Sequence, residues 1–347
     1  MALPSSGQIT LNQVNVELGN SGTAQIGLGD TAVRGLFEIS SGEIEMSDGY
    51  GKSSNKLSLV PTGGGTTILW DGLSNLTLSS SKEYTVTANA TLSVAVKMWG
   101  GGGARGFDYN GTFPNSTNMG DGGGGGFAGG TIAFVKGSTY KFQVGEGGVR
   151  TGTHDSGATW QAGGIAPHAA GKGGPQGGGY SGIFSSSASQ GNALLIAGGG
   201  GGGSSTNWSA NGGAGGGSSG QNAADNNQGG SGGTQSAGGA AAGYNGATAG
   251  SALRGGLTAN ASGSSQHNFL GGGGGGYYGG GGGNVGGGGG GSGYFKTSSP
   301  VSSGSTVVGS GANPGNISES LRSGAGDGGS SSQGSSGADG LIVLLGP

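Results

Sequence analysis

Apolar and polar side chains alternate with a period of two between residues 57 and 98. The alternation is clearest at 84–88 and 92–98, and it is typical of antiparallel strands that bury one face. Residues 136–138, Lys-Gly-Ser, separate two further apolar runs in the manner of a hairpin turn. These two runs predict strands at 131–135 and 140–144, and two other short apolar runs predict strands at 193–197 and 341–345. The pattern predicts a mainly β chain.

The first 56 residues have a helical pattern instead. Thr10 and Gln13 have the spacing of a capping box, just before apolar residues that share one face of a predicted helix. Asp30 is placed to cap a second helix at 31–37. Acidic and apolar residues then alternate at 43–46, as they would in a short strand. We predict a small α+β unit, which is too short to bury a large core by itself.

Glycine makes up 97 of the 347 residues. Runs of five or six consecutive glycines stand at 122–126, 198–203, 271–276, 279–283 and 286–291. Such runs suit neither helices nor ordinary strands, because glycine loses much backbone entropy and brings no side chain to a core. Two states stay open for these runs. They are either flexible linkers or extended left-handed helices, with three residues per turn, that hydrogen-bond to one another laterally.

Charge and strand placement favour the ordered state. Charged residues are 8% of the chain and the net charge is −3, so charge repulsion does not hold the chain open. Predicted strands lie on both sides of the glycine-rich stretch, and a loose loop of that length would be unusual within a compact domain. We therefore predict that the glycine-rich middle is a folded insertion in a β domain at 57–347.

The composition argues against several classes of partner. The chain has no cysteine, so it has neither disulfides nor thiolate metal ligands. It lacks the clustered Lys and Arg that a nucleic-acid partner would require. The N-terminus lacks the basic and apolar regions of a secretion signal, and the longest aliphatic run, 341–345, is too short to span a bilayer. We expect a protein that is made in a cytoplasm and does not insert into a membrane.

Titratable residues are too sparse to suggest an enzyme. Asp108, Asp121 and Asp155 are the candidates for a pair of glycosidase carboxylates, but few acidic residues surround them. His154 and His168 are fourteen residues apart in a glycine-rich loop and read as solvated side chains rather than metal ligands. We expect no catalytic activity, no cofactor and no metal.

Segments with larger side chains interrupt the glycine runs. If the runs are packed helices, these segments form the turns at the ends of the bundle, where recognition is usually placed. Trp160 and Trp208 could stack there on sugars or on a receptor surface. Tyr277 and Tyr278 lie between two glycine runs, so they could either bind in the same way or seal the edge of the bundle.

The order of strands and glycine runs resembles a known kind of domain. The run 94–103, Val-Ala-Val-Lys-Met-Trp followed by four Gly, is followed by 122–130 and by 140–148, Tyr-Lys-Phe-Gln-Val-Gly-Glu-Gly-Gly. With 195–203 and 337–343, these landmarks resemble the glycine-rich domain of phage tail-fibre proteins. They are also similar to the extracellular glycine-rich region of anaplastic lymphoma kinase-type receptors. The resemblance implies a jelly-roll-like antiparallel sandwich with an inserted bundle of polyglycine II helices.

A second resemblance concerns the N-terminal unit. The segments 3–9 and 46–53 look like the opening of many virion structural proteins of tailed phages. The resemblance implies that residues 1–56 attach the protein to the particle. The candidate docking residues are the apolar side chains of the two predicted helices, namely Leu11, Val14, Leu18, Val33, Leu36 and Phe37.

Together the resemblances imply a tail fibre, tail spike or tip adhesin of the virion tail, assembled in the host cytoplasm. Tip adhesins of some phages present receptor-binding loops from a polyglycine bundle. Here the candidate receptor contacts are Trp160, His168, Trp208, Tyr244 and His267. The expected partners are other tail or baseplate proteins and a host receptor, glycan or outer-membrane protein, with a homotrimer expected and a monomeric tip as the other possibility. The alternative is a purely structural capsid fibre, cement or decoration protein.

Overall fold

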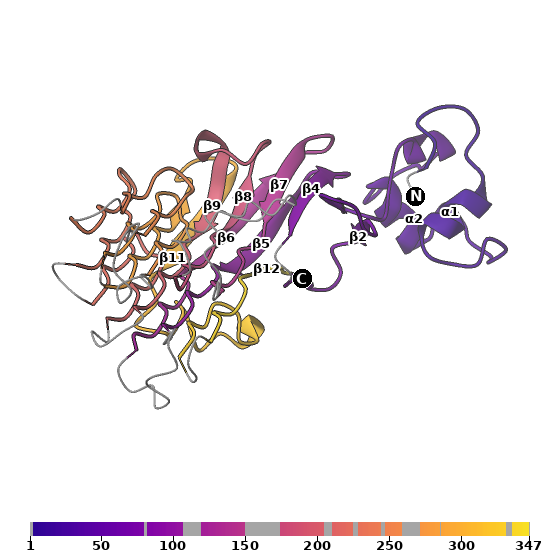
Figure 1. Cartoon of the computed structure of the whole chain (residues 1–347). Coiled ribbons are helices and arrows are strands. Elements are labelled where there is room, and N and C mark those ends of the chain that lie inside the picture. The colour runs from indigo at the N-terminus through magenta and orange to yellow at the C-terminus, as the bar shows by residue number, and fades with distance from the viewer. Residues whose placement is uncertain are drawn as a thin grey trace.

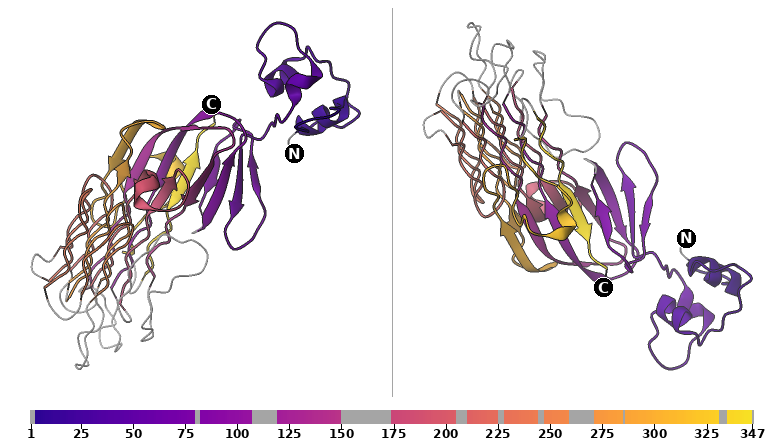
Figure 2. Two further views of the ribbon diagram at one scale, coloured as in Figure 1. Left: turned by 90° about the horizontal axis from the view of Figure 1, so that it is seen from above. Right: turned by 90° about the horizontal axis from the view of Figure 1, so that it is seen from below.

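Two antiparallel β-sheets lie between an N-terminal helical unit and a glycine-rich bundle (Figure 1). The computed structural model describes residues 3–79, 82–106, 119–149, 174–204, 210–224, 228–243, 247–258, 271–284, 286–330 and 335–346. The N-terminal unit and the bundle lie at opposite ends of an elongated molecule in each view (Figures 1 and 2). The described chain is mainly β, as the alternation of side chains predicts.

The larger sheet has seven strands in the order β10-β9-β8-β7-β4-β1-β2. In that order they are Tyr294–Phe295, Ala193–Ala197, Ser181–Phe184, Thr139–Gln143, Glu83–Ala88, Leu57–Pro61 and Ile68–Trp70. The smaller sheet has five strands in the order β11-β6-β5-β12-β3. They are Val301–Val307, Phe127–Phe134, Leu92–Trp99, Leu341–Leu344 and Leu76–Leu78. Both sheets are antiparallel throughout.

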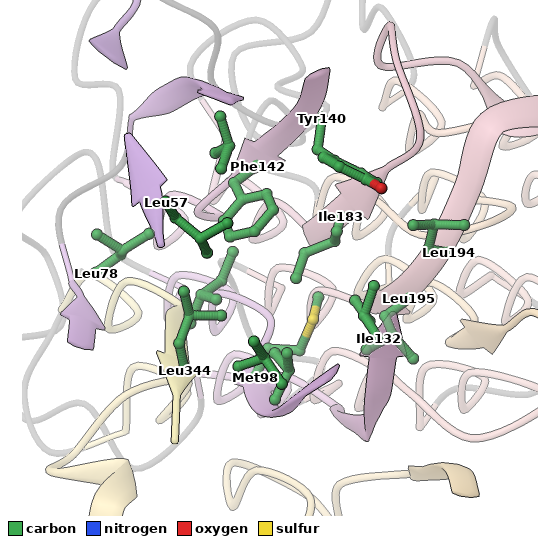
Figure 3. Close-up of a cluster of buried hydrophobic side chains, with 14 of the residues drawn as sticks. Leu57, Leu78, Met98, Ile132, Tyr140, Phe142, Ile183, Leu194, Leu195 and Leu344 are labelled. Carbon is green, nitrogen blue, oxygen red and sulfur yellow. The ribbon is translucent and has the colours of Figure 1, made fainter. Parts of the chain in front are cut away.

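Side chains from both sheets share one hydrophobic core (Figure 3). Leu57 and Phe142 come from the larger sheet and Met98 and Leu344 from the smaller, and all four are fully buried. Burying one such side chain stabilises the fold by roughly 1.5–3 kcal/mol. The alternation along β4 and β5 therefore reflects one face of each strand turned toward this shared core.

The C-terminal strand completes the smaller sheet. β12 pairs with β5 on one side and with β3 on the other. The strands before and after the glycine-rich stretch are thus neighbours, as expected for a folded insertion.

The hairpin expected around residues 136–138 is wrong. β6 belongs to the smaller sheet and β7 to the larger, so the turn carries the chain from one sheet to the other. The Val135 N–H donates to the Tyr140 hydroxyl over 3.0 Å, and the Phe134 and Tyr140 rings meet edge to face with centroids 4.8 Å apart. These side chains meet between the sheets, whereas a hairpin would have placed the two strands side by side in one sheet.

The N-terminal unit has its own hydrophobic cluster, which excludes the residues of the sheets. It contains helices α1, Leu11–Glu17, and α2, Thr31–Phe37. The predicted capping box is confirmed, because Thr10 and Gln13 make both of its hydrogen bonds. The strand expected at 43–46 is wrong. A 3₁₀ helix, η1 at Met46–Gly49, follows instead, and the Asp48 carboxylate accepts the Glu45 N–H over 2.8 Å.

Two other short 3₁₀ helices, η2 at Gln190–Asn192 and η3 at Ser320–Arg322, lie in connections. Several glycine segments are direct continuations of strands. Segments 100–106, 145–149 and 198–204 follow β5, β7 and β9, whereas 120–126, 174–180 and 335–340 lead into β6, β8 and β12. The bundle therefore grows out of one end of the sheets, away from the N-terminal unit (Figure 2).

Segment 100–106 shows how the glycine segments are held together. Every third N–H donates to the same neighbour, because Gly100, Gly103 and Gly106 donate to the carbonyls of Gly126, Gly123 and Gly120. The N–H groups between them donate to two other neighbours, Gly101 and Ala104 to 174–180, and Gly102 and Arg105 to 335–340.

The carbonyls of the same segment accept hydrogen bonds from three more segments. These are 145–149, 198–204 and 325–329. Segment 100–106 therefore has six hydrogen-bonded neighbours, and its backbone is satisfied without secondary structure of the usual kinds.

Close approach of backbones explains why these positions are glycine. A Cβ atom on Gly200 would lie 1.9 Å from the carbonyl oxygen of Gly123, and one on Gly103 would lie 2.0 Å from that of Gly201. Both distances are far inside van der Waals contact. At these positions only glycine lets the segments come close enough for their hydrogen bonds.

Candidate functional site

The candidate site is the distal end of the bundle, meaning the ends of the glycine segments farthest from the sheets. Eight stretches outside the described residues connect glycine segments, at 107–118, 150–173, 205–209, 225–227, 244–246, 259–270, 285 and 331–334. Hydrogen bonds join residues close to both ends of such stretches, for example Gly106 to Gly120, Gln176 to Val149 and Ser204 to Ala210. The fold therefore brings the attachment points of all eight stretches to one end of the molecule.

An ion pair lies at this end. The Arg105 Nε is 3.2 Å from Oδ1 of Asp121, and the same guanidinium donates from Nη1 to the Ser330 carbonyl over 2.6 Å. Burial raises the pKa of Asp121, and the positive charge of Arg105 offsets part of that increase. Through these contacts the Arg105 guanidinium links its own segment to those of Asp121 and Ser330.

Polar side chains complete the hydrogen bonding of the backbone where the glycine segments end. The Asn211 amide oxygen accepts the Asp121 N–H over 2.8 Å, and the Ser204 hydroxyl accepts the Ala210 N–H over 3.0 Å. Ser204 is fully buried. These side chains accept hydrogen bonds from backbone N–H groups that have no glycine segment beside them to supply a carbonyl. They therefore hold the ends of the connections in place.

The five residues expected to contact a receptor all fall in the connecting stretches. Trp160, His168, Trp208, Tyr244 and His267 lie outside the described residues. The structure shows where their stretches begin and end, and in each case this is at the distal end of the bundle. Asp108, Asp155 and the three histidines of the chain lie outside the described residues as well.

The candidate docking residues are described, and most of them are inside the N-terminal unit. Val14, Val33, Leu36 and Phe37 are buried in its hydrophobic cluster, and Leu18 packs against the cluster. Leu11 is 43% exposed. Of the six, Leu11 alone offers a substantially exposed side chain, since the others stabilise the unit from within.

A buried carboxylate joins the N-terminal unit to the segment that leads into the sheets. Oε1 of Glu17, at the end of α1, accepts hydrogen bonds from the Ser54 N–H over 2.9 Å and from the Ser53 hydroxyl over 3.0 Å. The Ser54 hydroxyl also donates to the Glu17 carbonyl over 2.6 Å. Five polar groups thus fix the direction in which the chain leaves the unit.

The described residues offer no arrangement typical of an active site. They contain no group of three or more His, Cys, Asp or Glu residues that could hold a metal ion. Asp121, the one described member of the three candidate carboxylates, is paired with Arg105. None of the helices in the described ranges has the length and apolar character needed to cross a membrane. Comparison of the chain with protein-family models and with curated proteins gives no match.

Sequence reasoning missed Arg105 and Asn211 as residues of the distal end. Arg105 is the first charged residue after the glycine run that follows β5, and Asp121 comes directly before the next long run. A charged residue at the outer boundary of a glycine run is a usable signal, because charges avoid the packed interior of the bundle.

Proposed function

We propose that this protein is a receptor-binding component of a phage tail, either a tail fibre or spike or a tip adhesin. The observation that carries the proposal is that the described residues flanking eight connecting stretches lie together at the end of the molecule opposite the N-terminal unit. Side-chain-rich connections on an ordered scaffold are a frequent place for recognition. In this proposal they contact a receptor, glycan or outer-membrane protein of the host.

We further propose that the glycine segments are polyglycine II helices inserted in a jelly-roll-like sandwich. The recurrence of the same neighbour at every third residue supports three residues per turn, and the six neighbours of segment 100–106 support hexagonal packing. Such a bundle needs no hydrophobic interior of its own. It holds the connections at fixed separations, which lowers the entropy lost when they bind.

The N-terminal unit takes the attachment role in this proposal. Its separate hydrophobic cluster supports a module that folds around its own core, and Leu11 and Val16 of α1 are exposed apolar side chains available to a partner. The Glu17 hydrogen bonds would transmit the orientation of the docked unit to the sheets.

Replacing residues 150–173 with a Gly-Ser linker tests the adhesin role. Virions that carry the variant should incorporate it normally but adsorb to host cells about tenfold more slowly or worse, a loss of about 1.4 kcal/mol of binding free energy. The matched control replaces residues 63–65, the turn between β1 and β2, and should leave adsorption unchanged. Normal adsorption of a variant in which residues 150–173 and the other long connections are all replaced would contradict the proposal.

Immunogold labelling of intact virions distinguishes the alternative, a capsid fibre, cement or decoration protein. Label at the tail tip or along a fibre is expected. Label on the head would contradict the tail location and leave the structural role as the better explanation.

A further inference from the structure

Three half-buried tyrosines gather where the proximal turns of the bundle meet the edge of the larger sheet. The Tyr277 and Tyr294 rings are stacked, with centroids 4.0 Å apart and planes within 9° of parallel. Tyr278 stands at 89° to Tyr277, with centroids 5.6 Å apart. Two ring planes at a right angle form an aromatic corner at the surface.

Packing accounts for two of the three rings. Tyr277 and Tyr294 lie against the cluster that contains Tyr180 and Ile196 on the outer side of the larger sheet. Tyr278 belongs to none of the hydrophobic clusters of the described chain. A structural plug therefore explains Tyr277 and Tyr294, whereas Tyr278 lies outside the cluster and contacts it through the Tyr277 ring.

Backbone hydrogen bonds fix the position of the corner. The Tyr277 carbonyl accepts from the Gln190 side chain over 2.7 Å, and the Tyr278 N–H donates to the Ser292 hydroxyl over 3.1 Å. Ser292 is fully buried and its hydroxyl donates in turn to the Thr234 carbonyl over 2.8 Å. The rings are thus held by the scaffold before any ligand arrives, which lowers the entropic cost of binding.

Polar groups around the corner are available to a ligand. Within the described chain, none of the three tyrosine hydroxyls takes part in a hydrogen bond. Burial raises the pKa of Tyr277, and the neighbouring Tyr294 and Tyr278 phenols raise it further, so the Tyr277 hydroxyl stays a neutral donor and acceptor at physiological pH.

A lysine lies beside the corner. The Lys296 N–H donates to the Leu194 carbonyl over 2.9 Å, which continues the pairing of β10 with β9 by one residue. Lys296 and Tyr294 are two residues apart on this extended segment and so point to the same face. Its ammonium makes no ion pair with the described residues. The surrounding ranges 185–196, 231–243, 247–258 and 271–298 contain no Asp or Glu.

We propose that this corner is a binding site for an acidic saccharide, such as a pyranose that carries a carboxylate. The C–H face of a pyranose ring stacks on an aromatic face, its hydroxyls pair with the tyrosine hydroxyls, and the carboxylate faces Lys296. The site lies on the side of the molecule near the sheets and is separate from the distal end. It does not depend on the proposed adhesin role.

Saturation-transfer NMR and amide-shift titration of the full chain test the proposal with two matched probes. Methyl galacturonide and methyl galactoside differ at C6, where the first carries a carboxylate and the second a hydroxymethyl group. Both should bind, the galacturonide about two- to fivefold more tightly, since a partly exposed ion pair adds a modest gain. The proposal is overturned if one or both probes fail to bind, or if the two bind equally.

Three variants locate the site. Tyr278→Ala should weaken both probes about two- to tenfold, as expected for loss of one aromatic contact. Lys296→Met should remove the preference for the galacturonide and leave galactoside binding unchanged, whereas the control Lys82→Met changes neither. Tyr278→Phe keeps the aromatic ring and takes the place of Tyr278→Ala if the alanine variant does not fold. Unchanged preference in Lys296→Met would overturn the assignment.

Discussion

Gly200 lies in the middle of segment 198–204, which hydrogen-bonds to six other segments. Its backbone is not in the left-handed region that favours glycine. What requires glycine is the 1.9 Å that would separate an added Cβ from the Gly123 oxygen. At the residue scale, the identity of the bundle residues is therefore set by distances between backbones rather than by backbone conformation.

Gly200→Ala should destabilise the protein by about 3 kcal/mol or more, at or above the upper end of the range for overpacked interiors, because the obstacle is backbone. Gly191→Ala is the matched control, since Gly191 is exposed and an added Cβ would meet nothing within 4 Å. Denaturant unfolding of both variants measures the difference. Equal midpoints would show that the segments are not packed as described.

Glu146 gives a residue-scale prediction about pH. Burial raises its pKa above the ordinary 4.5, and the nearby Asp339 carboxylate raises it further. The folded protein therefore holds this proton at higher pH than the unfolded chain does, so the contribution of Glu146 to stability falls as pH rises through the folded pKa.

Glu146→Gln should consequently raise the melting temperature at pH 7, and the gain should shrink toward pH 4, where Glu146 is protonated in both states. Glu43→Gln, at an exposed position of the N-terminal unit, is the control and should show no such trend. Melting curves between pH 4 and 8 decide the matter. A Glu146→Gln variant that is less stable at pH 7 would contradict the assigned cause.

At the element scale, strands with a similar pattern of side chains join different sheets. β4 and β5 are correctly predicted from alternation, but they lie in different sheets. β11 is missed because one of its seven residues is buried, so its sequence, Val-Ser-Ser-Gly-Ser-Thr-Val, carries little apolar signal. Alternation reports that one face of a strand is buried, and it does not report which sheet covers that face.

β12 is the element that closes the smaller sheet, so its core side chains should matter. Ile342→Ala is expected to cost about 2–5 kcal/mol, since Ile342 is fully buried in the shared core. Leu73→Ala, at a position that is 75% exposed, should change stability by less than about 0.5 kcal/mol. Thermal unfolding compares them, and a small effect of Ile342→Ala would mean that β12 is not integrated in the core.

The glycine segments are also an element-scale prediction. The amides of 199–204 all donate to neighbouring segments, so their hydrogen exchange should be slow, whereas exposed amides near Gly42 and Gly63 should exchange quickly. Exchange measured by mass spectrometry resolves these peptides. Exchange of 198–204 within seconds would favour the flexible-linker interpretation.

At the scale of the whole molecule, the two ends differ in structure. The sheets separate a helical unit with an exposed Leu11 from the distal end with its Arg105–Asp121 pair (Figure 2). The connection between the unit and the sheets depends on Glu17, whose carboxylate accepts from Ser53 and Ser54. This carboxylate should control how rigidly the ends are joined.

Glu17→Ala should leave the sheets and bundle folded but loosen the orientation of the N-terminal unit. Limited proteolysis between residues 53 and 57 should become faster, and small-angle scattering should show a broader range of lengths. Glu43→Ala is the control for loss of an acidic side chain in the same unit. Unchanged proteolysis in Glu17→Ala would show that the joint is held by other contacts.

The sequence by itself determined the mainly β class, the helical N-terminal unit with its capping box, and the ordered insertion as the favoured state of the glycine runs. Each of these follows from local periodicity, side-chain size or charge. The tertiary structure alone decided that β6 and β7 separate into different sheets, that residues 43–46 form no strand, and that the residues flanking eight connections lie at one end. Those outcomes depend on which segments become neighbours. Near-identical runs of glycine carry no local information about their partners, because side-chain identity is absent and the hydrogen-bonding backbone is the same in every run.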